Sequence, residues 1–439
     1  MSRHGFRFVH ATCLCLDEHL IGTGPLAVQD RALAEDATFR AWDGIVETCI
    51  GAQVEFLLLN GNSFNAKTNS LRARVALEKG FEKLAAQNIS VFVVPGPLDP
   101  LSAWKKGLRL PPNVTLLSNE DHEPVAVMND QKMLASIYVI ATAQADESQW
   151  SENGPAAFRQ YQTPFRIGLV GIGTPIRWEH GKPVPLEHHD GGTAAATLLT
   201  TAIDHKTDYI ALGEGTPFTE SHKSGIAHDP GCAQSLTSRI TGSRGCSVVN
   251  VDATGEVSID AVAVAPIRWD EYAISLESHT NPGDLVEKMA LVMMEQVPDN
   301  DERLWIVTWR LTGEGPLLDS LSQQTAQADL WKKLEGELTG ENSIRRVYRL
   351  ERGIASPLDA KRPSTTTATI TTAQGGLLYD FQVLLNESPA ELFEEVRREI
   401  LELDWIKGHD ARFIREAVQH LSRPNLLRRA QTAAGRYLE

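Results

Sequence analysis

The sequence predicts an α/β fold built around parallel strands, and three observations lead to this prediction. Two short runs, Val54–Leu59 and Ile89–Val94, are apolar almost throughout, as expected of strands that are covered on both faces. A helical pattern from about Leu71 to Gln87 separates them, and strand–helix–strand order favours parallel pairing through right-handed crossovers. Asp252-Ala253-Thr254-Gly255 then marks a hairpin turn, so part of the sheet structure is antiparallel.

The first element is expected to be a strand at Phe6–Val9, followed by a loop from His10 to Gly24 and then by a helix. In that helix apolar side chains recur at three- and four-residue steps, which places them on one face: Phe39, Trp42, Ile45, Val46, Cys49 and Ile50. The second helix is expected to bury Leu71, Val75, Phe81 and Leu84. Further strands are predicted at 167–170, 208–212, 247–251 and 257–264.

Four segments are expected along the 439 residues. A first α/β domain spans 1–268, and a small α+β domain spans 269–340, with a helix at Asp284–Gln296 and a strand at Leu304–Trp309. Residues 341–386 are expected to form an extended linker or arm, because the stretch from Ile354 to Gly376 is rich in Ser, Thr, Pro and Gly. Residues 387–439 predict helices, because Ser388, Pro389 and Glu391 form a helix-start pattern and an apolar stripe follows them.

The amino-acid composition limits the classes of function that the chain can have. Hydrophobic residues make up 42% and charged residues 23%, which is usual for a globular protein, and no apolar run approaches the ~20 residues that span a bilayer. The five cysteines show no disulfide spacing, and no signal-peptide pattern opens the chain, so a cytoplasmic location is expected. A formal net charge of -15 disfavours direct DNA binding, so DNA is expected to be contacted only indirectly.

Short polar or glycine-rich stretches follow the predicted strands, and they carry the functional information. They are His10–Leu16, Gly61–Asn65, Pro95–Pro100, Ile167–Gly171, Asp208–Thr216 and Ile226–Gly231. Their order and framing residues over about residues 6–270 resemble those of the calcineurin-like metallophosphoesterases, and most of all the SbcD-type DNA-repair exonuclease subunits. This resemblance implies a four-layer α/β/β/α sandwich with a small α+β capping domain and C-terminal helices.

In the resembled family these stretches carry the ligands of two metal ions, which activate a water and bind phosphoryl oxygens. Here every such position differs from the family pattern: Cys13 and Cys15 replace Asp and His, Asn62 replaces the bridging Asp, Pro97 and Leu98 replace Asn and His, and Gly171, Glu214 and Thr216 replace three His. We therefore expect these eight to be vestigial site positions, with no catalytic, cofactor-binding or metal-binding residue and no cofactor. The alternative is Mn or Zn at a non-standard site.

Some of these residues allow two interpretations. Cys13-x-Cys15 suits a soft metal, but two small buried thiols also simply fill space. Glu214 is either a stand-in ligand or general base, or an exposed carboxylate at a pocket mouth. Asp99 is expected to be structural. His188-His189-Asp190 is the densest histidine cluster, and a solvated loop is expected there in preference to a metal site.

The sequence thus predicts a catalytically inactive SbcD-like phosphoesterase subunit, a scaffold or regulator of an SMC-like ATPase in DNA repair or maintenance. The resemblance implies that the C-terminal helices bind the coiled-coil ATPase and that the chain forms a homodimer. The alternative is a metal-dependent nuclease or phosphoesterase with a non-standard metal site. A third class, a binding protein whose old pocket accepts a nucleotide or a phosphate-free ligand, is disfavoured because the pocket lacks a basic lining.

Overall fold

A computed structural model of the chain describes residues 5–118, 124–129, 132–142, 163–186, 192–338 and 344–352. Contacts divide the chain into two compact units. The first comprises Met1–Tyr272, Asn281–Arg310 and Gln323–Glu351, and the second comprises Ala273–Thr280, Leu311–Ser322 and Arg352–Glu439. The domain limits expected from the sequence stay a prediction.

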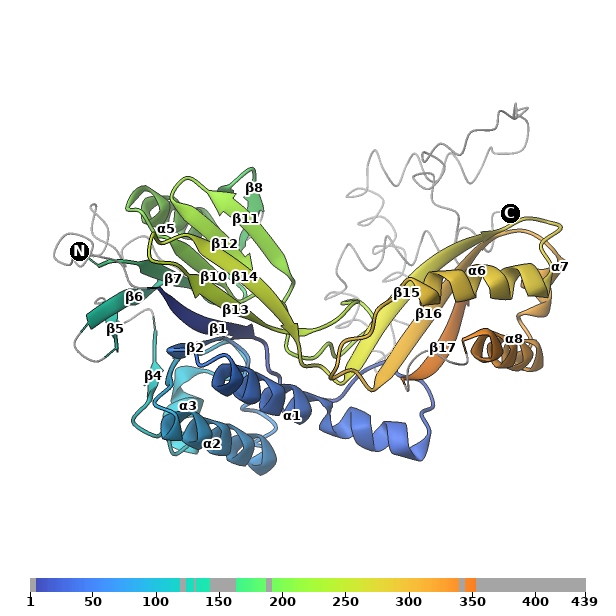
Figure 1. Cartoon of the computed structure of the whole chain (residues 1–439), viewed down its shortest axis with the longest axis horizontal. Helices are drawn as coiled ribbons and strands as arrows, with labels where there is room; N and C mark the ends of the chain where they lie inside the picture. Colours follow the sequence, from blue (N-terminus) through green and yellow to red (C-terminus); the bar gives the residue numbers. More distant parts are fainter. Residues whose placement is uncertain are drawn as a thin grey trace, which may run out of the picture. The chain divides into compact units, whose positions relative to one another are not determined.

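Two six-stranded sheets form the centre of the first unit (Figure 1). The first sheet has the order β14-β13-β1-β2-β3-β4, in which β1 to β4 are parallel and β13 and β14 are antiparallel. Its strands are β1 (Phe6–Thr12), β2 (Phe56–Asn60), β3 (Ser90–Val94), β4 (Val114–Leu116), β13 (Gly245–Val251) and β14 (Val257–Ala263). The strands predicted from apolar runs are confirmed.

The second sheet has the order β11-β12-β10-β7-β6-β5, with β6, β7, β10 and β12 parallel. Its strands are β5 (Val125–Asn129), β6 (Lys132–Ala141), β7 (Arg166–Val170), β10 (Tyr209–Leu212), β11 (Phe218–His222) and β12 (Gly225–Asp229). A separate two-stranded sheet pairs β8 (Ile176–Glu179) with β9 (Lys182–Pro185).

Successive side chains along a strand point to opposite faces of the sheet, and this alternation shows how the layers pack. In β2, Leu57 and Leu59 belong to a core shared with α1 (Val28–Gly51), α2 (Leu71–Ala86) and α3 (Leu101–Gly107). Phe56 and Leu58 face the other way, into a core that joins the two sheets. The outer face of the second sheet packs against α5 (Gly192–Asp204). The result is the α/β/β/α sandwich expected from the sequence.

Two details of the first sheet and its helices correct the sequence prediction. β1 continues through His10 to Thr12 instead of entering a loop at His10, because these residues pair with β2. In α2, Leu71 is 73% exposed and Val75 38% exposed rather than facing inward. The buried face consists of Ala73, Leu77, Gly80, Phe81 and Leu84, and it is set by packing on α1 and the sheet.

A three-stranded sheet with order β15-β16-β17 follows in the chain. It comprises β15 (Ile267–Leu276), β16 (Leu304–Gly313) and β17 (Arg345–Arg352), and it is accompanied by α6 (Pro282–Met294), α7 (Pro316–Ser320) and α8 (Gln324–Glu337). β17 occupies the start of the stretch expected to be a linker or extended arm. Asn281 and Asp284 form a capping box at the start of α6, which packs against α8.

Within the second unit the structure describes the ends of β15 and β16 together with α7. Gly313, at a φ of 99°, lies directly on the backbone of Leu276, where a side chain would not fit. Asp319 of α7 pairs with Arg352 at 2.6 Å. The helices expected after Ser388 lie outside the described residues.

Candidate functional site

The loops that leave the carboxyl ends of parallel strands in both sheets meet one another. The amide of Cys13, after β1, donates to Gly61 O, after β2, at 3.2 Å. The Cys13 thiol lies 3.8 Å from Gly213 O, after β10, and the amide of Cys232, after β12, donates to Gly215 O at 3.0 Å. Ligands of open α/β sheets bind at such strand ends. The structure therefore brings the loops that carry the predicted site positions together.

Asn60, the last residue of β2, joins the two sheets at this edge. Its buried side-chain amide donates to Val170 O of β7 at 2.9 Å and to Ala211 O of β10 at 3.0 Å. Both acceptors belong to the second sheet, whereas Asn60 belongs to the first. This role was missed from the sequence, although a polar residue that ends an apolar strand was the available hint.

Asp99 connects the loops after β2 and β3. Its fully buried carboxylate accepts hydrogen bonds from the amides of Asn62 (2.9 Å), Ser63 (2.8 Å) and Gly96 (2.7 Å) and from Trp104 Nε1 (3.2 Å). Burial raises the pKa of Asp99 to about 6, and these four donors oppose that rise. The structural role predicted for Asp99 is confirmed.

Asn62, the predicted site position after β2, has a left-handed φ of 49°. Its Oδ1 accepts a hydrogen bond from the amide of Leu98 at 3.0 Å, and its own amide donates to Asp99. The oxygen that could act as a weak ligand is thus engaged by the neighbouring backbone. This contact joins two of the predicted site positions, Asn62 and Leu98, without a metal between them.

Cys13 and Cys15 also adopt left-handed backbone conformations, with φ of 47° and 45°. Burial raises the pKa of Cys13 far above that of a free thiol, and it raises the pKa of Cys15 to about 12 and that of Cys232 to about 11. Burial thus favours the neutral thiol over the thiolate at these positions. The space-filling interpretation of Cys13 and Cys15 agrees with this environment.

Ile172, in the loop after β7, places an alkyl group between the loops. A β-carbon added at Gly61 would lie 2.8 Å from Ile172 Cγ2, and one added at Gly96 would lie 2.9 Å from the same atom. The two motif glycines therefore form a surface on which this methyl group packs. No sequence pattern marked Ile172, because a single apolar residue in a loop is not informative.

The remaining predicted positions lie around this centre. Gly171 is buried and its amide donates to Ala141 O at 2.9 Å. Glu214 is exposed, its Oε1 accepts from the amide of Gly173 at 2.9 Å, and partial desolvation raises the pKa of its carboxyl. Pro97 and Thr216 are exposed. His188, His189 and Asp190 lie outside the described residues.

Two histidines that sequence reasoning did not connect lie beneath the loops, between the sheets. His10 of β1 and His228 of β12 have ring centroids 5.9 Å apart, and His10 Nδ1 lies 3.0 Å from Tyr209 Oη. His228 contacts the hydroxyls of Thr219 (2.7 Å) and Ser247 (2.9 Å). Burial lowers the pKa of both rings, that of His228 to about 4, so both are neutral at pH 7. They form part of the polar core that joins the sheets.

The side chains at the eight predicted site positions do not fit a pair of hard metal ions. Such ions take carboxylate, amide and imidazole ligands. These positions hold two buried thiols, an amide oxygen bonded to the Leu98 amide, a carboxylate bonded to the Gly173 amide, a threonine, a proline, a leucine and a glycine. Within the described part of the chain, no group of three or more His, Cys, Asp and Glu residues could hold a metal ion. We therefore derive no chemistry through a metal.

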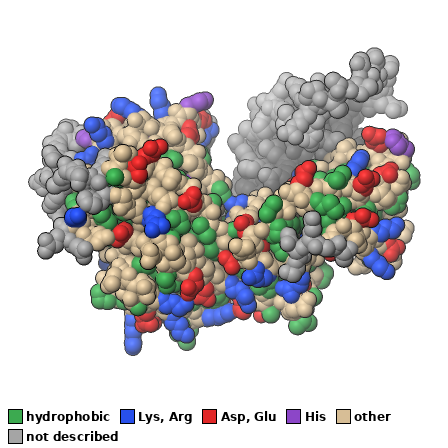
Figure 2. All heavy atoms as spheres, viewed as in Figure 1, with side chains coloured by type: hydrophobic (Ala, Val, Ile, Leu, Met, Phe, Trp, Pro, Cys, Tyr) green, Lys and Arg blue, Asp and Glu red, His purple; other side chains and the backbone are tan. Residues whose placement is uncertain are grey.

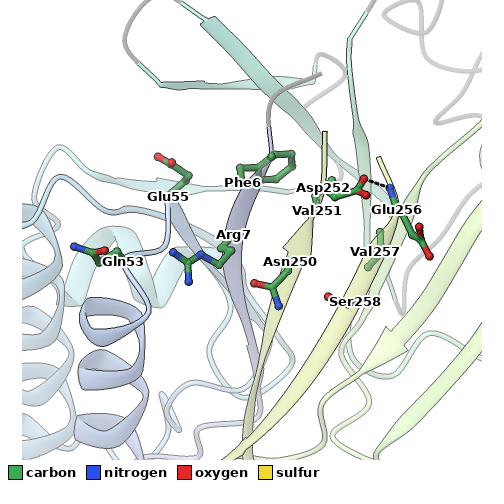
Figure 3. Close-up of a pocket in the computed structure, with 11 residues that line it drawn as sticks. Phe6, Arg7, Gln53, Glu55, Asn250, Val251, Asp252, Glu256, Val257 and Ser258 are labelled. Atoms are coloured by element: carbon green, nitrogen blue, oxygen red, sulfur yellow. Dashed lines mark hydrogen bonds between the residues drawn. The ribbon is translucent and has the colours of Figure 1, made fainter. Parts of the chain in front are cut away.

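A cavity of about 400 Å³ lies at the opposite end of β1 (Figure 3). Its lining includes Arg7, Glu55, Asn250 and Asp252, which mix both charges with amides. Asp252 is already engaged by the hairpin turn, where it accepts from the amides of Thr254 and Glu256 at 2.8 Å. This cavity shows no convergent set of groups comparable to the loop cluster.

The comparisons with known proteins agree with the metallophosphoesterase resemblance that the sequence shows. No family model matches the chain. Over 278 residues it is 28% identical to a Bacillus subtilis (strain 168) protein described as an uncharacterized metallophosphoesterase, YhaO, and the match covers 62% of this chain and 64% of that relative. The match thus spans slightly less than two thirds of the relative. The similarity supports the coarse placement of the chain with the metallophosphoesterases.

Two solved structures are similar at much lower identity. A dimetal phosphatase from Danio rerio is 10% identical with a TM-score of 0.35, covering 59% of this chain and 99% of that one. A protein from Thermus thermophilus is 10% identical with a TM-score of 0.33, covering 58% and 98%. Neither likeness bears on activity. The structure also contains no described helix that combines the length and apolarity needed to cross a membrane.

Proposed function

We propose that this chain is a catalytically inactive, SbcD-like member of the metallophosphoesterases that acts as a scaffold or regulator of an SMC-like ATPase in DNA repair or maintenance. The proposed catalytic inactivity rests on the set of contacts among the loops. Asn62 Oδ1 is occupied by the Leu98 amide, Ile172 packs on the motif glycines, and the thiols at 13 and 15 are buried and protonated. The loops after β1, β2, β3 and β7 are held together by these direct contacts.

The first test is metal content and turnover. We expect protein purified without chelator to contain far less than one equivalent of manganese, iron or zinc by plasma mass spectrometry, because only one of the eight predicted site positions, Glu214, holds a carboxylate and none holds an imidazole. We also expect no hydrolysis of a phosphodiester reporter such as bis-p-nitrophenyl phosphate when Mn²⁺ or Zn²⁺ is added.

The alternative function, a phosphoesterase or nuclease with a non-standard site, makes the opposite prediction. Stoichiometric Mn or Zn that disappears in a Cys13→Ser/Cys15→Ser variant, or hydrolysis abolished by Glu214→Ala, would establish it. The matched control is Cys49→Ser, because Cys49 is also a buried thiol but lies in the core with α1 and away from these loops. Metal that remains equally in all variants would point to adventitious binding.

The partner part of the proposal rests on the sequence of the C-terminal segment. Leu392, Phe393, Val396, Ile400 and Leu403 form an apolar stripe at helical spacing, and a stripe of this kind suits a groove or coiled coil on a partner. The acidic net charge of the whole chain supports indirect contact with DNA. A homodimer, also implied by the resemblance, belongs to the same proposal.

We expect deletion of residues 388–439 to abolish co-purification with a coiled-coil ATPase encoded in the same genome. The first unit should keep its unfolding temperature, because the cores described around its two six-stranded sheets are built from residues between Phe6 and Val264. A second variant replaces Leu392, Val396 and Ile400 by Ser in the full chain, without changing its charge. It should also fail to bind the ATPase. Undiminished binding by both variants would refute C-terminal docking, and light scattering of the same samples reports whether the chain is dimeric.

A further inference from the structure

A second cavity, remote in sequence from the loops of the candidate site, has three arginines in its lining and is called the arginine cavity below. It has a volume of about 400 Å³ and follows one face of the first half of α1, where Gln29, Ala32, Leu33, Asp36 and Arg40 recur at helical spacing. Arg303, directly before β16, and Arg345, the first residue of β17, complete the lining. All these residues belong to the first unit.

The charges in this arginine cavity are unbalanced. Asp36 is the one lining carboxylate, and it already pairs with Arg72 at 2.5 Å, outside the cavity. Arg345 pairs with the buried Asp30 at 2.9 Å. Arg303 Nη1 donates to the carbonyls of Asn300 and Glu302, at 2.5 and 2.9 Å, and the described residues provide no carboxylate within ion-pair distance of Arg40. Among the residues that the structure describes, the guanidinium groups of Arg40 and Arg303 therefore have no carboxylate partner.

This local charge contrasts with the rest of the molecule. The chain has a formal net charge of -15, and the face in Figure 2 shows acidic and basic side chains interspersed. Three guanidinium groups and one carboxylate, that of Asp36, line this cavity, so the charge of its lining favours an anion. Guanidinium also matches the geometry of phosphate oxygens and binds them through paired hydrogen bonds.

Helix α1 contributes no further anion site at its N-terminus, because its first turn already holds the carboxylate of Asp30, and the amides of Asp30 and Arg31 donate to Ala27 O. The cavity volume falls within the range of ~300–1,000 Å³ found for small-ligand sites.

We propose that the arginine cavity binds a phosphate group, with Arg40 and Arg303 as its main contacts and Arg345 as a third cation held in place by Asp30. The phosphate belongs either to a free nucleotide or pyrophosphate, or to a nucleic acid backbone. The site is independent of the proposed function, because none of its residues belongs to the motif loops.

The test measures phosphate binding to the full chain with two probes, always in excess EDTA so that no metal can bridge a phosphate. Titration calorimetry with inorganic pyrophosphate probes a free ligand, and fluorescence anisotropy of a labelled short duplex DNA probes a backbone phosphate. The variant is Arg40→Ala, and the matched control is Arg31→Ala, an exposed arginine on the same helix that does not line the cavity.

We expect Arg40→Ala to weaken binding about tenfold, the effect of roughly 1.4 kcal/mol for a lost charge-assisted contact, and Arg31→Ala to leave it unchanged. Arg303→Ala should repeat the loss. Binding of pyrophosphate identifies a free ligand, and binding of duplex alone with the same variant pattern identifies a nucleic acid. Failure of both probes to bind, or equal binding by the Arg40 and Arg31 variants, would overturn the proposal and leave the question of catalytic inactivity untouched.

Discussion

Replacing Asp99 by alanine is expected to lower the free energy of unfolding by roughly 3–5 kcal/mol. The substitution removes the acceptor of four hydrogen bonds and leaves the buried amides of Asn62, Ser63 and Gly96 without a partner. It also frees the indole N–H of Trp104, a fully buried side chain. Urea denaturation followed by tryptophan fluorescence measures the loss.

Two comparisons make this result specific. Asp204→Ala removes an exposed carboxylate that pairs with Lys223 at 3.0 Å, and it should cost less than about 1 kcal/mol.

The second comparison is Asp99→Asn, which keeps the volume of the side chain but removes the carboxyl group that titrates. Because the folded-state pKa of Asp99 is raised to about 6, the folded protein binds the proton more tightly than the unfolded chain. The wild type should therefore gain stability relative to Asp99→Asn as the pH falls from about 7 to about 5. A loss in Asp99→Ala no larger than in Asp204→Ala would contradict the structural role.

Replacing Arg268 by alanine should have an effect of similar size, roughly 3–5 kcal/mol. Arg268 of β15, with a side chain only 10% exposed, bonds Asp270 at 2.8 Å, lies 3.8 Å from Glu302, and stacks on Trp305 at 4.7 Å. Its removal leaves two buried carboxylates without their cation. Desolvation already raises the pKa of both Asp270 and Glu302, and loss of the arginine should raise them further.

The sign of the pH dependence follows from this shift. In Arg268→Ala the folded state binds protons at Asp270 and Glu302 more tightly than the unfolded state, so the deficit against wild type should shrink as the pH falls toward 5. Arg310→Ala is the matched control, because Arg310 pairs with Glu271 at 2.8 Å while 43% exposed, and it should cost at most about 1 kcal/mol. Equal losses in the two variants, or a deficit that grows on acidification, would show that the buried network is not held by its arginine.

Much of the sandwich could be predicted from local patterns. The runs that became β2 and β3 are apolar on both faces because each face meets its own core, and a continuous apolar run expresses that directly. The short strands β11 and β12 were missed, since their alternation is brief and polar residues interrupt it. β5 was missed for the same reason.

The candidate site, like the fold, could be predicted from the sequence only in part. Replacement of the ligand positions is visible in the sequence, because each position stands at a fixed place in a motif frame. What occupies the space instead depends on contacts between distant residues, as with Ile172 on Gly61 and Gly96 or Asn60 on Ala211. The pairing of His10 with His228 joins residues from two sheets, and no local pattern encodes such a pair.

The backbone of the loops has a consequence for how metal chemistry could arise on this chain. Cys13, Cys15 and Asn62 hold left-handed conformations, and aspartate, asparagine and histidine adopt these more readily than most residues. Carboxylate and imidazole side chains at these positions would therefore need no new loop path. Under the proposal of inactivity, the obstacles to a working centre would be the methyl group of Ile172 between the loops and the side chains at the predicted positions on the second sheet. The proposed inactivity would then be a change of side chains alone, which substitution could reverse.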